Sequence, residues 1–310
     1  MEQDKPIVFY YPPMENLART VAACRGYDIG EINWQSFKDG WPNVRFSVKE
    51  RPVIFFISLD HPADLAPVMF TLYQMPEESM GPMHIILPYY PVGTMERADR
   101  PGEVISADGL AKMFSVIPLS RQGGRHLLSV FDIHDKRIKS YFKGNVIFKS
   151  HTTVPLLINE ILRIVREKGI EIDDIAVMLP DKGASLRYEK DLPSWVKLIR
   201  CDKSRNGDQR TIIVKDGNPH DKHVIIVDDI VNSGGTQREG RDKMIELGAA
   251  SVSAYVGHGV FPSDDDRKKR IQPESFEEFM MTDSCSRAVK LERALPYKIL
   301  SLAPLICEIV

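Results

Sequence analysis

The chain has 310 residues, enough for about two domains of ordinary size. Its 41 basic and 43 acidic residues give a formal net charge of −2, so no overall positive field attracts a nucleic-acid backbone. The apolar runs are far shorter than the ~20 residues of a membrane span, and four scattered cysteines suit a reducing compartment, so we expect a cytoplasmic protein that binds neither nucleic acid nor membrane.

The first half of the chain alternates short apolar runs with amphipathic stretches. Strands are expected at residues 7–10, 53–59, 84–87 and 127–133, and helices at 14–25, 63–74 and 106–116. Gly26 follows the first helix, where glycine adopts the left-handed capping conformation at little cost. Near-continuous apolar strands separated by helices are typical of mainly parallel sheets that are covered on both faces.

A second, similar series follows, and it indicates a second α/β domain. We expect helices at residues 154–168 and 236–247, and strands at 175–179, 196–199, 211–214, 224–227 and 251–256. The two domains are predicted to join near residues 148–153. We assign residues 1–150 to the first domain and 151–297 to the second, and we expect residues 298–310 to return to the first domain.

The stretch that follows strand 224–227 combines two acids with a glycine-rich turn. Asp228 and Asp229 lie at the carboxyl end of this strand, where open α/β sheets bind ligands, and adjacent strand residues point to opposite faces. Carboxylates accept hydrogen bonds from a sugar diol. The turn that opens the next helix offers backbone N–H groups to a phosphate, and it consists of Asn232, Ser233, Gly234, Gly235 and Thr236. The stretch therefore predicts a phosphorylated-sugar site, the alternative being a plain strand–turn–helix connection with surface acids.

This segment, VIIVDDIVNSGGT at Val224–Thr236, closely resembles the phosphoribosyl diphosphate (PRPP) motif of the phosphoribosyltransferase fold. The motif is shared by transferases that consume PRPP and by PRPP synthetase (ribose-phosphate diphosphokinase), so alone it indicates the ligand and not the reaction. The chain length and the second α/β series favour the synthetase. The resemblance implies an α/β protein with two phosphoribosyltransferase-like domains, each a mainly parallel sheet flanked by helices.

Three further segments resemble the synthetase. FDIHD (131–135) is similar to its "DLH" segment, which implies metal ligands at Asp132 and His134, placed on one face of a strand by their i, i+2 spacing. PDKGASLR (180–187) resembles a segment whose acid, here Asp181, helps to hold a metal and the ribose. CDKSRNGD (201–208) resembles the flexible catalytic loop, with Lys203 and Arg205 acting on the phosphates. Taken singly, each segment has another reading: His134 could be a structural histidine, Pro180-Asp181 could form a turn, and 201–208 could be a solvated charged loop.

Two more segments concern the nucleotide. FKDGWPN (37–43) resembles the loop that one subunit lends to another, with Phe37 stacking on adenine and Asp39 accepting from it. PYYPVGTMER (88–97) stands where most synthetases carry YARQDR, so Arg97 is kept whereas Thr94 and Met95 replace the usual arginine and glutamine. These departures resemble the divergent class II synthetases known mainly from plants.

The resemblance implies an Mg²⁺-dependent transferase of nucleotide biosynthesis that converts ATP and ribose 5-phosphate into PRPP and AMP. It also implies a homo-oligomer made of dimers, with hexamers common in the family. The ATP-binding residues would be Phe37, Asp39, Arg97 and His134. Two alternatives stay open at this point: a non-catalytic regulatory subunit of the same fold, which Thr94 and Met95 keep possible, and a transferase that consumes PRPP, which needs a base-binding hood.

Overall fold

The computed structural model describes residues 5–48, 50–206, 209–261, 275–292 and 294–310, and for residues 204–206 and 209–211 the backbone alone. The chain divides into two compact units. One consists of Met1–His151 together with Ser301–Val310, and the other of Thr152–Leu300. None of the helices in the described parts of the chain is long and apolar enough to cross a membrane.

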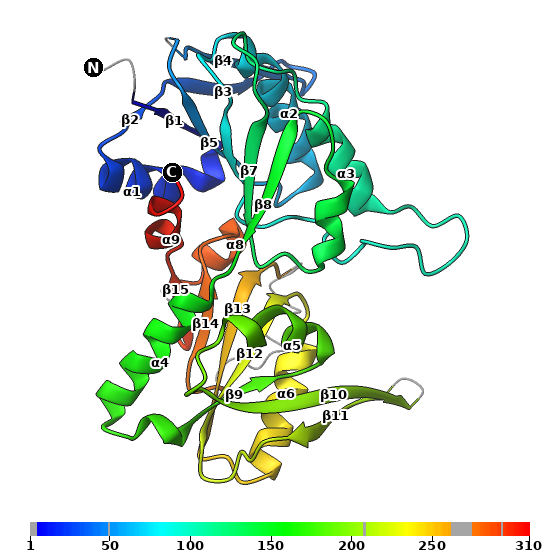
Figure 1. Ribbon diagram of the computed structural model, residues 1–310, viewed down its shortest axis with the longest axis vertical. Helices are drawn as coiled ribbons and strands as arrows, with labels where there is room; N and C mark the ends of the chain where they lie inside the picture. The colour runs from blue at the N-terminus through cyan, green and yellow to red at the C-terminus, as the bar shows by residue number, and fades with distance from the viewer. Residues whose placement is uncertain (1–4, 49, 207–208, 262–274, 293) are drawn as a thin grey trace. The chain divides into compact units, whose positions relative to one another are not determined.

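A six-stranded parallel sheet forms the centre of the first unit, with strand order β2-β1-β5-β6-β7-β8 (Figure 1). Its strands are β1 (Ile7–Tyr10), β2 (Asp28–Ile29), β5 (Val53–Phe56), β6 (His84–Ile86), β7 (His126–Phe131) and β8 (Val146–His151). A separate antiparallel hairpin consists of β3 (Ile32–Ser36) and β4 (Pro42–Phe46). The sequence did not indicate this hairpin, because its side chains are half-buried or exposed and lack a regular apolar alternation.

All but the last of the helices of the first unit lie between these strands in the chain. They are α1 (Glu15–Arg25), α2 (Leu65–Gln74), α3 (Ser106–Ser115) and α9 (Ala303–Cys307), with short 3₁₀ turns η1 (Pro12–Met14), η2 (Pro62–Asp64), η3 (Met75–Glu77) and η4 (Lys136–Tyr141). Gly26 ends α1 in the left-handed conformation at φ 64°, as the sequence predicted. The C-terminal helix α9 packs against α1, so both ends of the chain contribute to this unit.

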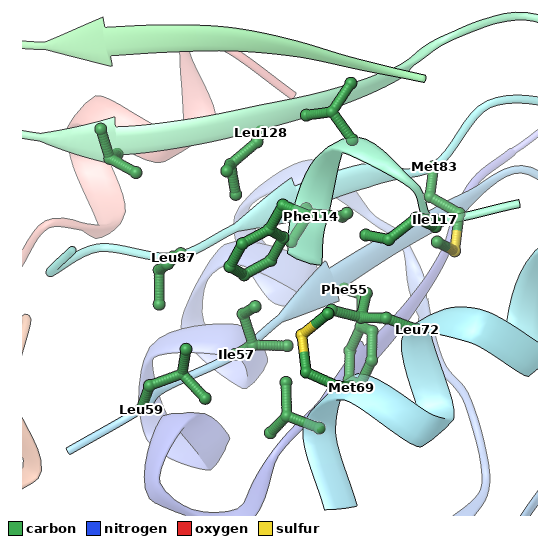
Figure 2. Packing of buried hydrophobic residues seen from close by; sticks show 14 of the residues in the cluster. Phe55, Ile57, Leu59, Met69, Leu72, Met83, Leu87, Phe114, Ile117 and Leu128 are labelled. Carbon is green, nitrogen blue, oxygen red and sulfur yellow. The ribbon is translucent and has the colours of Figure 1, made fainter. Parts of the chain in front are cut away.

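Apolar side chains of β5, α2 and α3 meet in the core of the first unit (Figure 2). Phe55, Leu72 and Phe114 are fully buried there. Burying a side chain of this size stabilises a fold by about 2 kcal/mol relative to leaving it exposed. The hairpin joins this core through Trp34, whose ring stacks on that of Phe55 with centroids 6.2 Å apart.

The second unit contains a seven-stranded sheet of order β11-β10-β9-β12-β13-β14-β15, parallel except for the β10–β11 pair. Its strands are β9 (Ile175–Leu179), β10 (Lys197–Asn206), β11 (Gln209–Asp216), β12 (His223–Val231), β13 (Ser251–Gly259), β14 (Phe279–Thr282) and β15 (Tyr297–Leu300). Its helices are α4 (Val154–Lys168), α5 (Lys182–Tyr188), α6 (Gly235–Glu246) and α8 (Ser286–Val289), with 3₁₀ turns η5 (Ile172–Asp174) and η6 (Glu189–Asp191).

These two units confirm the predicted α/β class with mainly parallel sheets, but several boundaries differ from the prediction, including the following three. Strand β12 continues four residues past Val227, because it keeps pairing with β13 as far as Val231. The segment expected to be a loop at 201–208 continues strand β10 through Asn206, where it pairs with β11. Tyr297–Leu300 pairs with β14, so the chain returns to the first unit at Ser301 and not at residue 298.

Candidate active site

The order of strands in the second unit defines where its functional edge lies. Strand β9 leads to β10 on one side, whereas β12 leads to β13 on the other, and β9 and β12 are neighbours. The connections therefore diverge between these two strands, and α/β sheets bind ligands at the carboxyl ends of strands at such a point. Asp181 follows β9, and Asp228 and Asp229 lie near the end of β12.

The two adjacent acids are buried inside β12 and have different partners. Asp228 and Asp229 expose only 8% and 3% of their surface. The Asp228 carboxyl accepts hydrogen bonds from the Asp229 backbone N–H (3.0 Å) and from Gln237 Nε2 (3.3 Å). Asp229 Oδ1 lies 3.0 Å from Nη1 of Arg187, itself largely buried. The two acids have different partners because the side chains of neighbouring strand residues point to opposite faces of the sheet.

Burial also changes the protonation of this pair. Burial first, and then the charge of Asp229, raises the pKa of Asp228 to about 8, although Lys203 and Arg187 oppose the shift. Burial and the neighbouring charge therefore favour the protonated form of Asp228 more than in an exposed aspartate. The sequence placed the two carboxylates on opposite faces of the strand, but it did not reveal how completely both would be withdrawn from water.

The glycine-rich turn follows β12 directly, as predicted. Gly234 adopts a left-handed conformation at φ 76° at the N-cap of α6, and α6 begins at Gly235. A glycine cap has no side chain to satisfy the first N–H groups of a helix, which leaves them available to an anion. Asn232 is exposed, and Ser233 and Thr236 are half-buried beside it. The five predicted phosphate-binding residues thus lie next to the buried acids.

Asp181 and Lys203 form an ion pair in the same unit. One carboxylate oxygen of Asp181 caps α5 by accepting from the backbone N–H of Ala184 at 2.9 Å, and the other accepts from Lys203 Nζ. Burial alone would raise the pKa of Asp181, but the hydrogen bond and charge of Lys203 outweigh it and hold that pKa below its usual value. The side chain of Arg205, the other predicted catalytic cation, lies outside the described residues.

The side chains near this site show how a metal ion could be bound. Among the residues that the structure describes, no group of three or more His, Cys, Asp or Glu side chains is arranged to hold a metal ion. Mg²⁺ prefers oxygen ligands and is usually held by one or two carboxylates together with substrate phosphates. The Asp181 carboxylate, partly exposed at the end of β9, fits that pattern, whereas the imidazole of His134 suits Mg²⁺ poorly.

The structure corrects the predicted setting of Asp132 and His134. Strand β7 ends at Phe131, and Asp132 adopts a left-handed conformation at φ 38°, so these two residues do not share one face of a strand. The Asp132 backbone N–H donates to the carbonyl of His151, and its side chain is buried. A non-glycine residue with positive φ is uncommon and is found most often for Asp and Asn.

The segment that contains His134 lies against the one that contains Arg97. A Cβ atom at Gly93 would lie 3.5 Å from the His134 Cβ, so the two backbones approach closely there. Nη2 of Arg137 lies 2.9 Å from the buried Glu96 carboxylate. Arg97 pairs with Asp99 at 2.9 Å and keeps 59% of its side chain exposed. Two of the predicted ATP-binding segments are therefore neighbours in the first unit.

The other predicted nucleotide residues lie on the turn of the β3–β4 hairpin. Phe37 is 56% exposed, and its backbone N–H donates to the carbonyl of Trp41 across the turn. The Asp39 carboxylate accepts from the Trp41 N–H at 3.2 Å, so it stabilises the turn itself. The exposed ring of Phe37 is available for stacking, whereas one oxygen of Asp39 is already engaged.

Sequence reasoning missed two residues that contact the acids. Arg187 lies within the segment 180–187 that had been singled out for Asp181, but its pairing with Asp229 joins residues 42 positions apart, as their numbers show. Gln237 follows the glycine-rich turn in helix α6 and carried no motif of its own. The only signal that could have singled out Gln237 is its burial in the first turn of the helix, and burial cannot be seen in the sequence.

Comparison with known proteins covers both units. The model of the N-terminal domain of ribose phosphate pyrophosphokinase matches residues 7–117, and the phosphoribosyl transferase domain model matches residues 158–285. Ribose-phosphate pyrophosphokinase 4 of Arabidopsis thaliana is 35% identical over 318 residues, covering 99% of this chain and 92% of that protein. The protein of the same name from Oryza sativa subsp. japonica is 35% identical over 312 residues, covering 97% and 94%.

The fold of the whole chain has a solved counterpart. The crystal structure of phosphoribosylpyrophosphate synthetase from Mycobacterium smegmatis superposes with a TM-score of 0.79 at 22% sequence identity, covering 99% of this chain and 97% of that one. At this level of identity the likeness concerns the fold.

Proposed function

Since the chain belongs to the ribose-phosphate pyrophosphokinase family, we propose that it transfers the diphosphoryl group of ATP to the anomeric hydroxyl of ribose 5-phosphate, giving PRPP and AMP, with the sugar phosphate bound at the end of β12. The predicted resemblance, including the likeness to plant proteins, is confirmed, and so is the presence of two phosphoribosyltransferase-like domains. The regulatory alternative is not favoured, because relatives matched over more than nine tenths of their length carry the name of the enzyme.

The observation that carries the proposed site is the juxtaposition of buried Asp228 with the glycine-capped start of α6. These two features suit the two parts of a pentose phosphate. The helix N-terminus suits the phosphate, and the acid suits the sugar hydroxyls. We propose that Asn232–Thr236 bind the 5-phosphate and that Asp228 and Asp229 bind the ribose diol.

Lys203 is proposed to stabilise the charge that develops during transfer. Phosphoryl transfer depends mainly on positioning and on electrostatic stabilisation of the phosphoryl oxygens. In the ligand-free protein Lys203 is paired with Asp181, so it must exchange this carboxylate for the phosphates when substrates bind. To raise the rate, this contact has to be stronger in the transition state than in the complex with bound substrates. Arg205 is proposed to assist it.

Magnesium is proposed to accompany the nucleotide. Bound Mg²⁺ would neutralise phosphate charge and thereby lower the repulsion that faces an attacking oxygen. Asp181, once released by Lys203, is the carboxylate best placed in the second unit to hold it. Asp132 and His134 stay predicted ligands, with Asp132 the better match as an oxygen donor.

On the nucleotide side, we propose that Phe37, Asp39, Arg97 and His134 contribute to binding ATP. The exposure of Phe37 supports stacking on a base, and the exposure of Arg97 supports contact with phosphates. A homo-oligomer built from dimers is also proposed. The cytoplasmic location stays a prediction, since three of the relatives are named as mitochondrial or chloroplastic proteins.

The function is tested by measuring AMP release from ATP and Mg²⁺ with and without ribose 5-phosphate. We expect AMP to form only when the sugar phosphate is present. The Asp228→Ala variant should bind ribose 5-phosphate more weakly, because it loses a diol acceptor. Release of ADP, or AMP formation that ignores the sugar phosphate, would exclude the proposed reaction.

A further inference from the structure

One buried polar side chain links the two halves of the proposed sugar-phosphate site. Gln237 is the third residue of α6 and exposes 2% of its surface. Its Nε2 donates to Asp228 Oδ2 at 3.3 Å. Burying an amide is costly unless it is hydrogen-bonded, so a glutamine at this position is explained by what it bonds to.

This contact constrains the Asp228 carboxyl from two directions. One oxygen accepts from the Asp229 backbone N–H at 3.0 Å, and the other accepts from Gln237. The first donor is fixed to β12 and the second to the first turn of α6, beside the glycine-rich turn. The carboxyl is therefore held in one plane, at a fixed place relative to the helix start that is proposed to bind the phosphate.

We infer that Gln237 is a positioning residue that orients Asp228 toward the ribose diol and so sets the preference for ribose 5-phosphate over 2-deoxyribose 5-phosphate. This inference rests on the proposed sugar-phosphate site. A site that is organised to hydrogen-bond a hydroxyl rejects an analogue lacking it, because a buried polar group then stays unpaired. A carboxyl that is free to rotate finds other partners and discriminates less.

A purely structural role for Gln237 makes a different prediction. If the side chain only fills space between α6 and β12, an apolar residue of similar length should weaken binding of both sugars equally or of neither. If it positions Asp228, the same change should weaken binding of ribose 5-phosphate selectively. Gln237→Met removes the donor and keeps the length of the side chain.

Met244 offers a matched control. It lies two turns further along α6, on the same face as Gln237, and is fully buried. Met244→Leu disturbs the packing of this helix face without removing a hydrogen bond. Should Gln237→Met fail to fold, Gln237→Leu removes the same donor with a different side-chain shape.

The test measures the Kd of both sugar phosphates by calorimetry, together with the rate of AMP formation. For Gln237→Met we expect the Kd for ribose 5-phosphate to rise about 3- to 10-fold, the range for one lost hydrogen bond. The Kd for the deoxy sugar should change little, so the preference for ribose 5-phosphate should fall by the same factor. Met244→Leu should keep the preference of the unmodified protein. An unchanged preference in Gln237→Met overturns the inference. Binding of ribose 5-phosphate without AMP formation in the unmodified protein would instead contradict the proposed reaction alone.

Discussion

The Lys203 ammonium group forms an ion pair with the Asp181 carboxylate, which also caps helix α5. The predicted catalytic cation and the predicted metal ligand therefore neutralise each other in the ligand-free protein. In the proposed mechanism, binding of a metal–nucleotide complex at this edge of the sheet separates them, and each group then gains a new partner of opposite charge. Replacing Lys203 should therefore change turnover, whereas replacing Asp181 should change the magnesium requirement.

Replacing Lys203 by alanine should lower turnover about 100-fold, because a charge donor to the transition state is lost. The affinity for ribose 5-phosphate should stay close to that of the unmodified protein. Steady-state kinetics and calorimetry measure the two quantities. Lys197→Ala is the matched control, since Lys197 lies on the same strand and pairs with Asp173. Near-normal turnover of Lys203→Ala would remove this residue from the mechanism.

Replacing Asp181 by asparagine should raise the Mg²⁺ concentration needed for half-maximal activity. Asparagine caps a helix as well as aspartate does, so any loss of thermal stability should be limited to that of the ion pair with Lys203, whereas the negative charge that attracts the metal is lost. Activity measured against Mg²⁺ concentration checks this, with Asp173→Asn as the control for an acid elsewhere in the unit. Identical magnesium curves for Asp181→Asn and the unmodified protein would refute the assignment.

Replacing Arg187 by methionine should destabilise the protein by about 3 kcal/mol, because it removes one partner of a buried ion pair. Chemical denaturation gives the free energy of unfolding. Adding Asp229→Asn should restore a large part of the loss, since the buried negative charge is then removed as well. A single variant that loses less than about 1 kcal/mol, the range of an exposed pair, would show that this ion pair is unimportant for folding.

The stability of the protein should fall as the pH drops from 7 to 5. Burial, and then the charge of His151, lowers the pKa of His84 to about 4, and its Nε2 lies 2.8 Å from Ser129 Oγ. Because the folded pKa lies below the unfolded value of about 6.5, the neutral form favours folding above pH 6.5, and this contribution is lost on acidification. The loss for this one group is about 2 kcal/mol at pH 5.

The variant His84→Asn should make the dependence of unfolding free energy on pH shallower over this range. His220→Asn, at an exposed position, serves as the control and should leave the slope unchanged. Equal slopes for His84→Asn and the unmodified protein would mean that another group is responsible for the acid sensitivity.

Sequence patterns predicted the buried framework well, because burial on both faces leaves a continuous apolar run. Strands β1 and β9 and helix α4 lie at the predicted residues. The extension of β10 through Lys203 was not predictable in the same way, because its polar residues are placed by pairing with β11 and not by burial. Polar strand ends depend on partners that are distant in sequence.

The candidate site was predictable only where a local motif exists. The acids and the glycine turn at 228–236 follow one another along the chain, so their proximity is dictated by the sequence. Arg187 and Gln237 contact those acids through the packing of α5 and α6 against β12, which no local pattern encodes. The pKa of Asp228 likewise depends on burial by the folded sheet.

The central claim is that a diphosphoryl group moves intact from ATP to a sugar phosphate held at the end of β12. The most direct measurement follows ATP labelled at its β-phosphorus during incubation with Mg²⁺ and ribose 5-phosphate. We predict that the label appears in the diphosphate of PRPP while unlabelled AMP is released, and that Asp228→Ala strongly reduces this transfer at low ribose 5-phosphate. Label that remains in ADP, or that stays in ATP at every substrate concentration, would contradict the claim.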